Sequence, residues 1–129
     1  MNIPARRRPG APAPGHALQV IRSGYGLALV LAPGPVIRLA TGRPPGRRTR
    51  WAARVLGTRH LVQAALTAAA PMPAVFAVGG QVDTLHATSM LLLAAVSQGG
   101  RRAALTDALT EAGFAAAGFS ASIYSQPWR

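Results

Sequence analysis

The chain has 129 residues, half of them hydrophobic, and a net charge of +11, and this length favours a single domain. It contains no cysteine, which excludes disulfides, thiolate metal sites and cysteine nucleophiles. Fourteen arginines, with no lysine, face only three acidic residues, Asp83, Asp107 and Glu111. A strongly basic balance is typical of nucleic-acid-binding proteins, but the distribution of the charges predicts another class.

Charged residues are nearly missing from the centre of the sequence, where only Arg59 and Asp83 are charged across residues 55–100. Soluble domains have about 25% charged residues, and a soluble helical domain would need a charged outer face here. The sequence therefore predicts a multi-pass integral protein of the cell membrane, with no nucleic-acid partner. A basic, soluble nucleic-acid-binding protein is the more distant alternative.

The N-terminal part combines a tail with a short apolar helix. Residues 1–15 are rich in proline and arginine and are expected to be disordered. A helix is predicted over 16–32, ended by Pro33 and Pro35, and is expected to be retained rather than removed as a signal. Its apolar part is short for a span of about 20 residues. Either Arg22 reaches a head group, or residues 36–40 continue the buried length as a second, broken piece.

Three further helices are predicted over 51–70, 74–96 and 102–123, followed by a tail at 125–129. The turns between them are short, so consecutive helices should be antiparallel neighbours. The predicted fold is thus all-α, a four-helix transmembrane bundle over residues 16–124 with a disordered N-terminal tail.

In such a bundle the first and third loops lie on the same side, and both are rich in arginine. Arginines near a membrane surface contact anionic lipid head groups. The predicted head-group contacts are Arg43, Arg47, Arg48, Arg50, Arg54, Arg101 and Arg102.

Polar residues inside the predicted helices converge at one depth. With a rise of 1.5 Å per residue, Arg59, Asp83, His86 and Glu111 all fall roughly 12 to 16 Å from the same membrane edge. Membrane helices direct such groups towards each other. The predicted buried polar cluster is Arg59, His60, Gln63, Asp83, His86 and Glu111.

An ion pair of Arg59 with Asp83, supplemented by Glu111, would remove most of the cost of burying these charges. We expect this pair to fix the register of the helices. A proton or ion pathway through Asp83, His86 and Glu111 is the functional alternative. Metal binding by His60, His86, Asp83 and Glu111 is disfavoured, because Asp-x-x-His spacing is common and Arg59 would repel a cation. The sequence predicts no catalytic residue, no metal and no cofactor.

Two short motifs carry a resemblance. Residues 54–64, with Leu56-Gly57-Thr58-Arg59-His60, and residues 82–90, with Asp83-Thr84-Leu85-His86, resemble elements of small four-helix integral membrane proteins of unknown function from high-GC bacteria. The resemblance covers about residues 17–120 and implies a fold and a membrane location, not an activity.

The predicted function is therefore that of a structural or accessory bundle, held together by buried polar pairs. Its expected partners are membrane lipids, and either further copies of itself or a larger membrane protein. The alternative is a small transporter or channel, which at this size would need to oligomerise.

Overall fold

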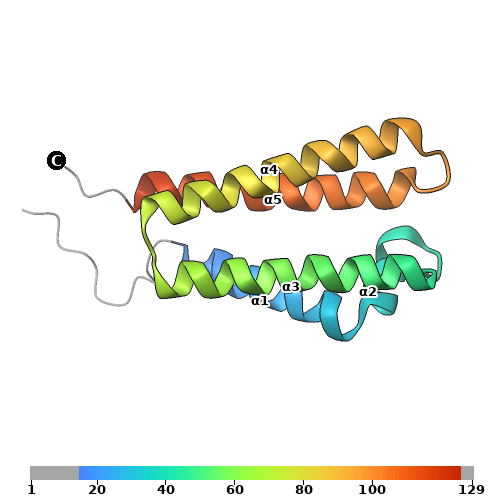
Figure 1. The fold of residues 1–129 in the computed structure, drawn as a ribbon, viewed down its shortest axis with the longest axis horizontal. Helices are drawn as coiled ribbons and strands as arrows, with labels where there is room; N and C mark the ends of the chain where they lie inside the picture. Colours follow the sequence, from blue (N-terminus) through green and yellow to red (C-terminus); the bar gives the residue numbers. More distant parts are fainter. Residues whose placement is uncertain (1–14, 126–129) are drawn as a thin grey trace, which may run out of the picture.

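The computed structural model describes residues 15–125, which form five α-helices and no strand (Figure 1). The helices are α1 (His16–Leu31), α2 (Pro33–Thr41), α3 (Arg47–Ala69), α4 (Pro73–Val96) and α5 (Arg101–Tyr124). The predicted tails, apart from Gly15 and Ser125, lie outside the described residues.

The four long helices form two antiparallel pairs. In Figure 1, α1 packs closely against α3 and α4 against α5, whereas the backbones of the two pairs approach each other at few places. Consecutive helices α3 and α4 are joined by a short turn but belong to different pairs. Helices α3 and α4 are antiparallel, as are α4 and α5, but α3 and α4 meet through side chains such as Arg59 and Gln63 on Asp83 rather than by close backbone packing.

Glycines permit the close approach within each pair. A Cβ atom added to Gly57 of α3 would lie 2.6 Å from the carbonyl oxygen of Gly26 in α1, and one added to Gly26 would lie 2.9 Å from that of Gly57. In the second pair, Cβ atoms on Gly80 and Gly118 would each lie 3.2 Å from a backbone oxygen of the partner helix. Only a residue without a side chain lets two helix backbones come this near.

The short helix α2 turns away from α1 at the end of the bundle. The two helices meet at Ala32, and their axes differ by 104°. Helix α1 ends at Leu31, before Pro33. Pro33 then begins α2, because proline is well tolerated at the first position of a helix, where no backbone N–H is needed. The segment predicted as a break or a broken continuation is therefore a separate helix.

The predicted four-helix transmembrane bundle was wrong. The structure has five helices between residues 15 and 125, and none of them is both long enough and apolar enough to cross a membrane alone. Only α1 and α2 taken together, across their bend, satisfy that requirement of length and composition. The long helices contain polar groups, such as Arg59, His60 and Gln63 in α3. These groups lower the mean hydropathy of the helices below the value expected of a membrane-spanning helix.

We expect Gly57→Ala to destabilise the protein by about 1–3 kcal/mol, the usual cost of forcing extra atoms into a packed interface. Gly24→Ala in α1 is the matched control, since a Cβ there meets no atom within 4 Å and alanine favours helix by up to about 1 kcal/mol. Chemical unfolding followed by circular dichroism measures both. Equal stabilities for the two variants would contradict the close glycine contact.

Candidate functional site

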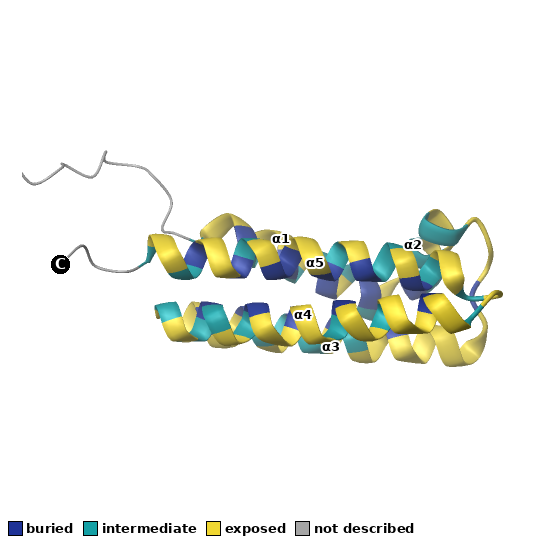
Figure 2. Cartoon of the chain, turned by 90° about the horizontal axis from the view of Figure 1, so that it is seen from above, coloured by how far each residue is buried: buried dark blue, intermediate teal, exposed yellow. Residues whose placement is uncertain are grey.

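The interior of the bundle contains charges where a small helical protein would normally have only apolar side chains. Burial colours in Figure 2 place the buried residues between the helices and the exposed ones outside. His60, Asp83 and Glu111 are the largest side chains that are completely buried. Together with Arg22 and Arg59 they form the buried ion cluster, to which α1, α3, α4 and α5 all contribute.

Asp83 on α4 is the most heavily bonded member. Arg22 of α1 donates to both carboxylate oxygens, with Nη2 2.5 Å from Oδ2 and Nη1 3.4 Å from Oδ1. From α3, Arg59 Nη2 donates to Oδ1 at 3.4 Å and Gln63 Nε2 at 3.2 Å. These four donors connect α4 to both helices of the other pair, and hydrogen bonds to a carboxylate are among the stronger ones in proteins.

Glu111 on α5 is the second buried carboxylate. The Arg59 guanidinium donates to its Oε2, and His60 Nε2 lies 2.8 Å from its Oε1. That second approach is too poorly aligned to be a hydrogen bond, so Oε1 has no hydrogen-bond partner. Burial raises the pKa of Glu111, but the contacts with His60 and Arg59 outweigh burial and leave the pKa below its ordinary value.

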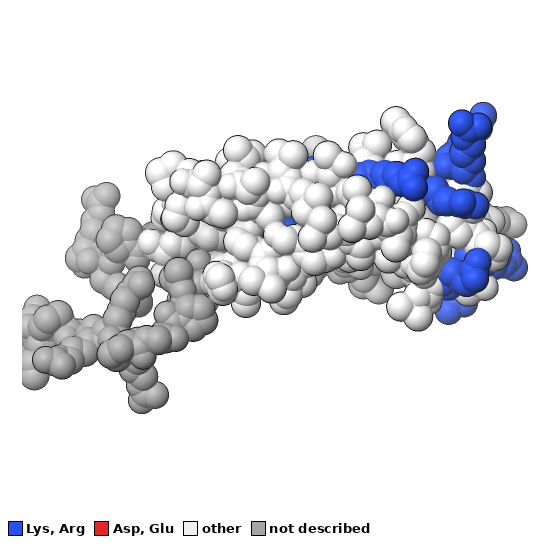
Figure 3. All heavy atoms as spheres, turned by 90° about the horizontal axis from the view of Figure 1, so that it is seen from below, with Lys and Arg blue, Asp and Glu red and all other residues white. Residues whose placement is uncertain are grey.

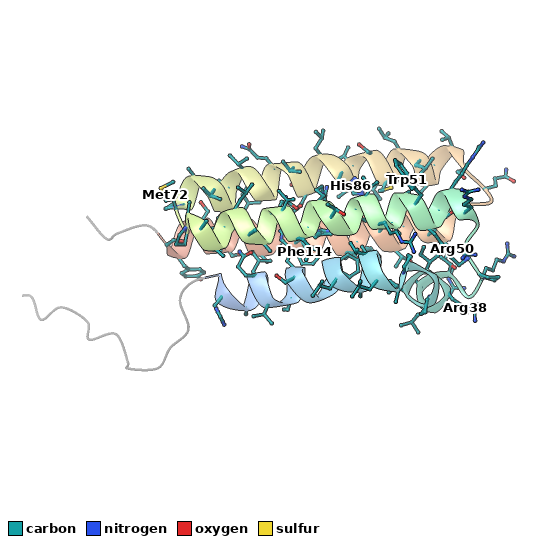
Figure 4. All side chains as sticks on the ribbon, turned by 60° about the horizontal axis from the view of Figure 1, so that its bottom comes forward. Arg38, Arg50, Trp51, Met72, His86 and Phe114 are labelled. Atoms are coloured by element: carbon teal, nitrogen blue, oxygen red, sulfur yellow. The ribbon has the colours of Figure 1, made fainter. Side chains whose placement is uncertain are left out.

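Aromatic rings enclose one side of the cluster. The His60 ring lies 5.3 Å from that of Tyr25 and 4.9 Å from that of Phe114, centroid to centroid. The Arg22 guanidinium lies over Phe114, 4.9 Å from its centroid, a cation–π contact. Figure 4 shows Phe114 between the helices. Burial, followed by the negative charges of Asp107 and Glu111, raises the pKa of Tyr25 to about 12.

A second polar contact lies beside the cluster. His86 Nε2 of α4 is 2.9 Å from Asp107 Oδ2 of α5. Unlike the buried carboxylates, these two side chains are 27% and 21% exposed. The contact therefore has access to the surface, and solvent screens it more than it screens the contacts of Asp83.

The structure brings together five of the six residues of the predicted polar cluster: Arg59, His60, Gln63, Asp83 and Glu111. His86 lies beside this group, with a ligand atom within 4.8 Å of one from Glu111, and its ring contacts Asp107. Arg22 was not predicted to join the cluster: one of two alternatives had it reach a head group, and Asp107 had no predicted contact. The available signal for burial of Arg22 was its spacing. It shares the buried face of α1 with Leu18, Gly26 and Leu29.

The seven arginines predicted to contact lipid are all exposed. Arg54 donates from Nε to the carbonyl oxygen of Val30, 3.2 Å away, near the end of α1. The others lie where α2, the loop before α3 and the turn before α5 meet, at the arginine-rich end. On the face shown in Figure 3, arginines gather at this end and the long sides are otherwise almost free of charge.

The chemistry of the cluster is that of a structural contact. Arg22 and Arg59 together balance the charges of the two buried carboxylates, Asp83 and Glu111. The bonds run between the two helix pairs rather than within one pair. This arrangement fixes how the pairs are positioned relative to each other.

Comparisons with known proteins found no family model, no curated protein and no solved structure that matches this chain. The resemblance to small bacterial membrane proteins stays a prediction.

Replacing Arg22 by methionine should lower the free energy of unfolding by about 3–5 kcal/mol, because it removes one partner of a buried ion pair and leaves the other in the interior. Arg38→Met is the matched control, since Arg38 is exposed on α2 and surface changes stay within about 0.5 kcal/mol. Denaturant titration of both variants provides the measurement. If Arg22→Met is as stable as Arg38→Met, the ion cluster does not hold the helix pairs together.

Stability should decrease in acid. The pKa of Glu111 lies below its ordinary value of 4.5 in the folded chain, so the unfolded chain takes up its proton first. The contribution of Glu111 is complete above pH 4.5 and is lost as the pH falls through the lowered pKa. Unfolding curves from about pH 7 to about pH 3 should therefore decline less steeply for Glu111→Gln than for the wild type. Parallel decline in both proteins would argue against a depressed pKa.

Proposed function

We propose that this chain is a non-enzymatic, membrane-associated helical bundle that serves as a structural or accessory subunit in the cell membrane. The observation that carries the proposal is an inverted distribution of polarity. Asp83 and Glu111 are buried, Asp107 is half-buried, and these are all the acidic residues of the chain. Large apolar side chains are exposed instead.

Exposed apolar side chains occur on every long helix. On α4 alone they form most of the outer surface: Val78, Val82, Leu85, Leu91, Leu92, Leu93 and Val96. Leaving such a side chain in water instead of burying it costs roughly 25 cal/mol of free energy per Å² of apolar surface. Monomeric soluble proteins rarely expose extended apolar patches. We propose that lipid acyl chains cover these sides.

The arginine-rich end supports an oriented arrangement against anionic lipid. Arg38 and Arg50 lie together at this end in Figure 4, far from Met72. Trp51 at the start of α3 is 68% exposed, and tryptophan is enriched at membrane interfaces. A cationic end next to apolar, uncharged sides matches the boundary between phosphate head groups and acyl chains.

Vesicle flotation tests this proposal with the purified full-length chain. Vesicles of phosphatidylcholine containing phosphatidylserine should bind the protein more tightly than phosphatidylcholine alone. Replacing Arg47, Arg48 and Arg50 by glutamine should weaken binding to the anionic vesicles by about 100-fold, at about 1 kcal/mol for each arginine. The matched control replaces the same three residues by lysine, which keeps the charge and should keep the binding.

Two results would overturn the proposal. One is a monodisperse protein in the soluble fraction that binds neither vesicle. The other is a soluble homo-oligomer, in which copies of the chain rather than lipid cover the apolar sides. A proton or ion flux across the same vesicles, abolished by Glu111→Gln, would instead favour the small oligomeric transporter.

A further inference from the structure

Three potential metal ligands come together where α4 and α5 pack. One ligand atom from each of His86, Asp107 and Glu111 lies within 4.8 Å of the other two. Asp107 and Glu111 are four residues apart on α5 and so share a face of that helix. The antiparallel α4 places His86 against that face, with its Nε2 2.9 Å from Asp107 Oδ2.

The charges around these ligands are not balanced. Arg22 and Arg59 neutralise two carboxylates, Asp83 and Glu111. Between residues 15 and 125, Asp107 forms its ion-pair contact with His86 and with no arginine. With neutral imidazoles, the five groups Arg22, Arg59, Asp83, Asp107 and Glu111 carry one excess negative charge. Either a proton on a histidine or a bound cation would offset it.

A separate observation favours a cation at this position. Glu111 has no solvent exposure, and its Oε1 accepts no well-aligned hydrogen bond, because His60 Nε2 lies 2.8 Å away but is poorly oriented. A buried carboxylate oxygen without a partner is costly, and a metal ion is one way to satisfy it. His86 and Asp107 are partly exposed, so two of the three potential ligands can be reached from solvent.

We propose that His86, Asp107 and Glu111 bind one divalent transition-metal ion, with zinc the best match. Zinc takes imidazole nitrogen and carboxylate oxygen ligands at about 2.0–2.2 Å, so neighbouring ligand atoms lie about 3–3.5 Å apart. His86 Nε2 and Asp107 Oδ2 already fulfil this spacing. The more distant ligand atoms have to move closer by roughly 1 Å, leaving one tetrahedral position for water.

This ligand set differs from the one considered from the sequence. The oxygens of Asp83 are occupied by Arg22, Arg59 and Gln63, and Asp107 takes its place as a carboxylate ligand. The Arg59 guanidinium on Glu111 Oε2 opposes a second cation nearby. We therefore expect affinity in the micromolar range, below that of closed structural zinc sites, with His86 and Asp107 as the principal ligands.

Isothermal titration of the full-length protein with Zn²⁺ tests the site, and Co²⁺ absorption reports the coordination. The wild type should bind one ion. His86→Gln and Asp107→Asn should each lower the affinity by about 100-fold or more. Loss of a residue that only hydrogen-bonds to a metal ligand already lowers metal affinity by about 10- to 100-fold, and these two residues are themselves proposed ligands. His16→Gln is the matched control, because His16 is exposed at the start of α1, and it should bind as the wild type does.

Both ligand variants are at half-exposed positions, and circular dichroism verifies that they fold. If either variant unfolds, the thermal stability of the wild type is measured with and without Zn²⁺ instead. Saturating Zn²⁺ should raise it. The proposal fails if the wild type binds no Zn²⁺ up to about 1 mM, or if the His86→Gln/Asp107→Asn double variant binds as tightly as the wild type. These results are independent of membrane binding, which uses the outer surface and the arginine-rich end.

Discussion

The carboxylate of Asp83 is the contact on which the arrangement of the bundle depends. It accepts hydrogen bonds from Arg22 on α1 and from Arg59 and Gln63 on α3, so a single side chain of α4 connects one helix pair to the other. The backbones of the two pairs approach each other at few places. Because removing one partner from a buried ion pair leaves an uncompensated charge, other registers between the pairs are strongly disfavoured.

Two kinds of packing coexist in this chain. Within each pair, glycines allow the backbones to touch. Between the pairs, long polar side chains fill the space beside an apolar cluster of Leu18, Phe76, Phe114 and Ala121. The buried apolar residues of the described chain are mostly alanines, and only Leu18, Leu29, Phe76 and Phe114 are larger. The apolar side chains that do not fit inside remain on the outer surface. The proposed membrane association and the proposed metal site thus depend on different parts of the molecule, the outer surface and the interior between α4 and α5.

The sequence was most informative where a depth argument applied. Counting residues from the helix ends placed Arg59, Asp83 and Glu111 at a similar height, and in the structure Arg59 contacts both carboxylates. The same counting could not reveal Arg22, because its role depends on which helix packs beside α1. It also grouped His86 with the cluster, and in the structure His86 lies near Glu111, but its ring contacts Asp107, a contact that the counting did not predict. Depth along a helix is fixed locally, but the direction a side chain faces depends on packing.

The sequence by itself determined that the chain is helical, because apolar and alanine-rich segments are separated by proline and glycine turns. It also determined that few charges occur in the centre of the chain and that most arginines lie near the helix ends. Only the tertiary structure decided that α1 packs with α3 and α4 with α5, and that α2 is a separate helix. It also decided that Arg22 donates to both oxygens of Asp83. The physical reason is that these features depend on glycine contacts and ion pairs between residues far apart in the chain, such as Gly26 with Gly57 and Arg22 with Asp83, and no local pattern encodes them.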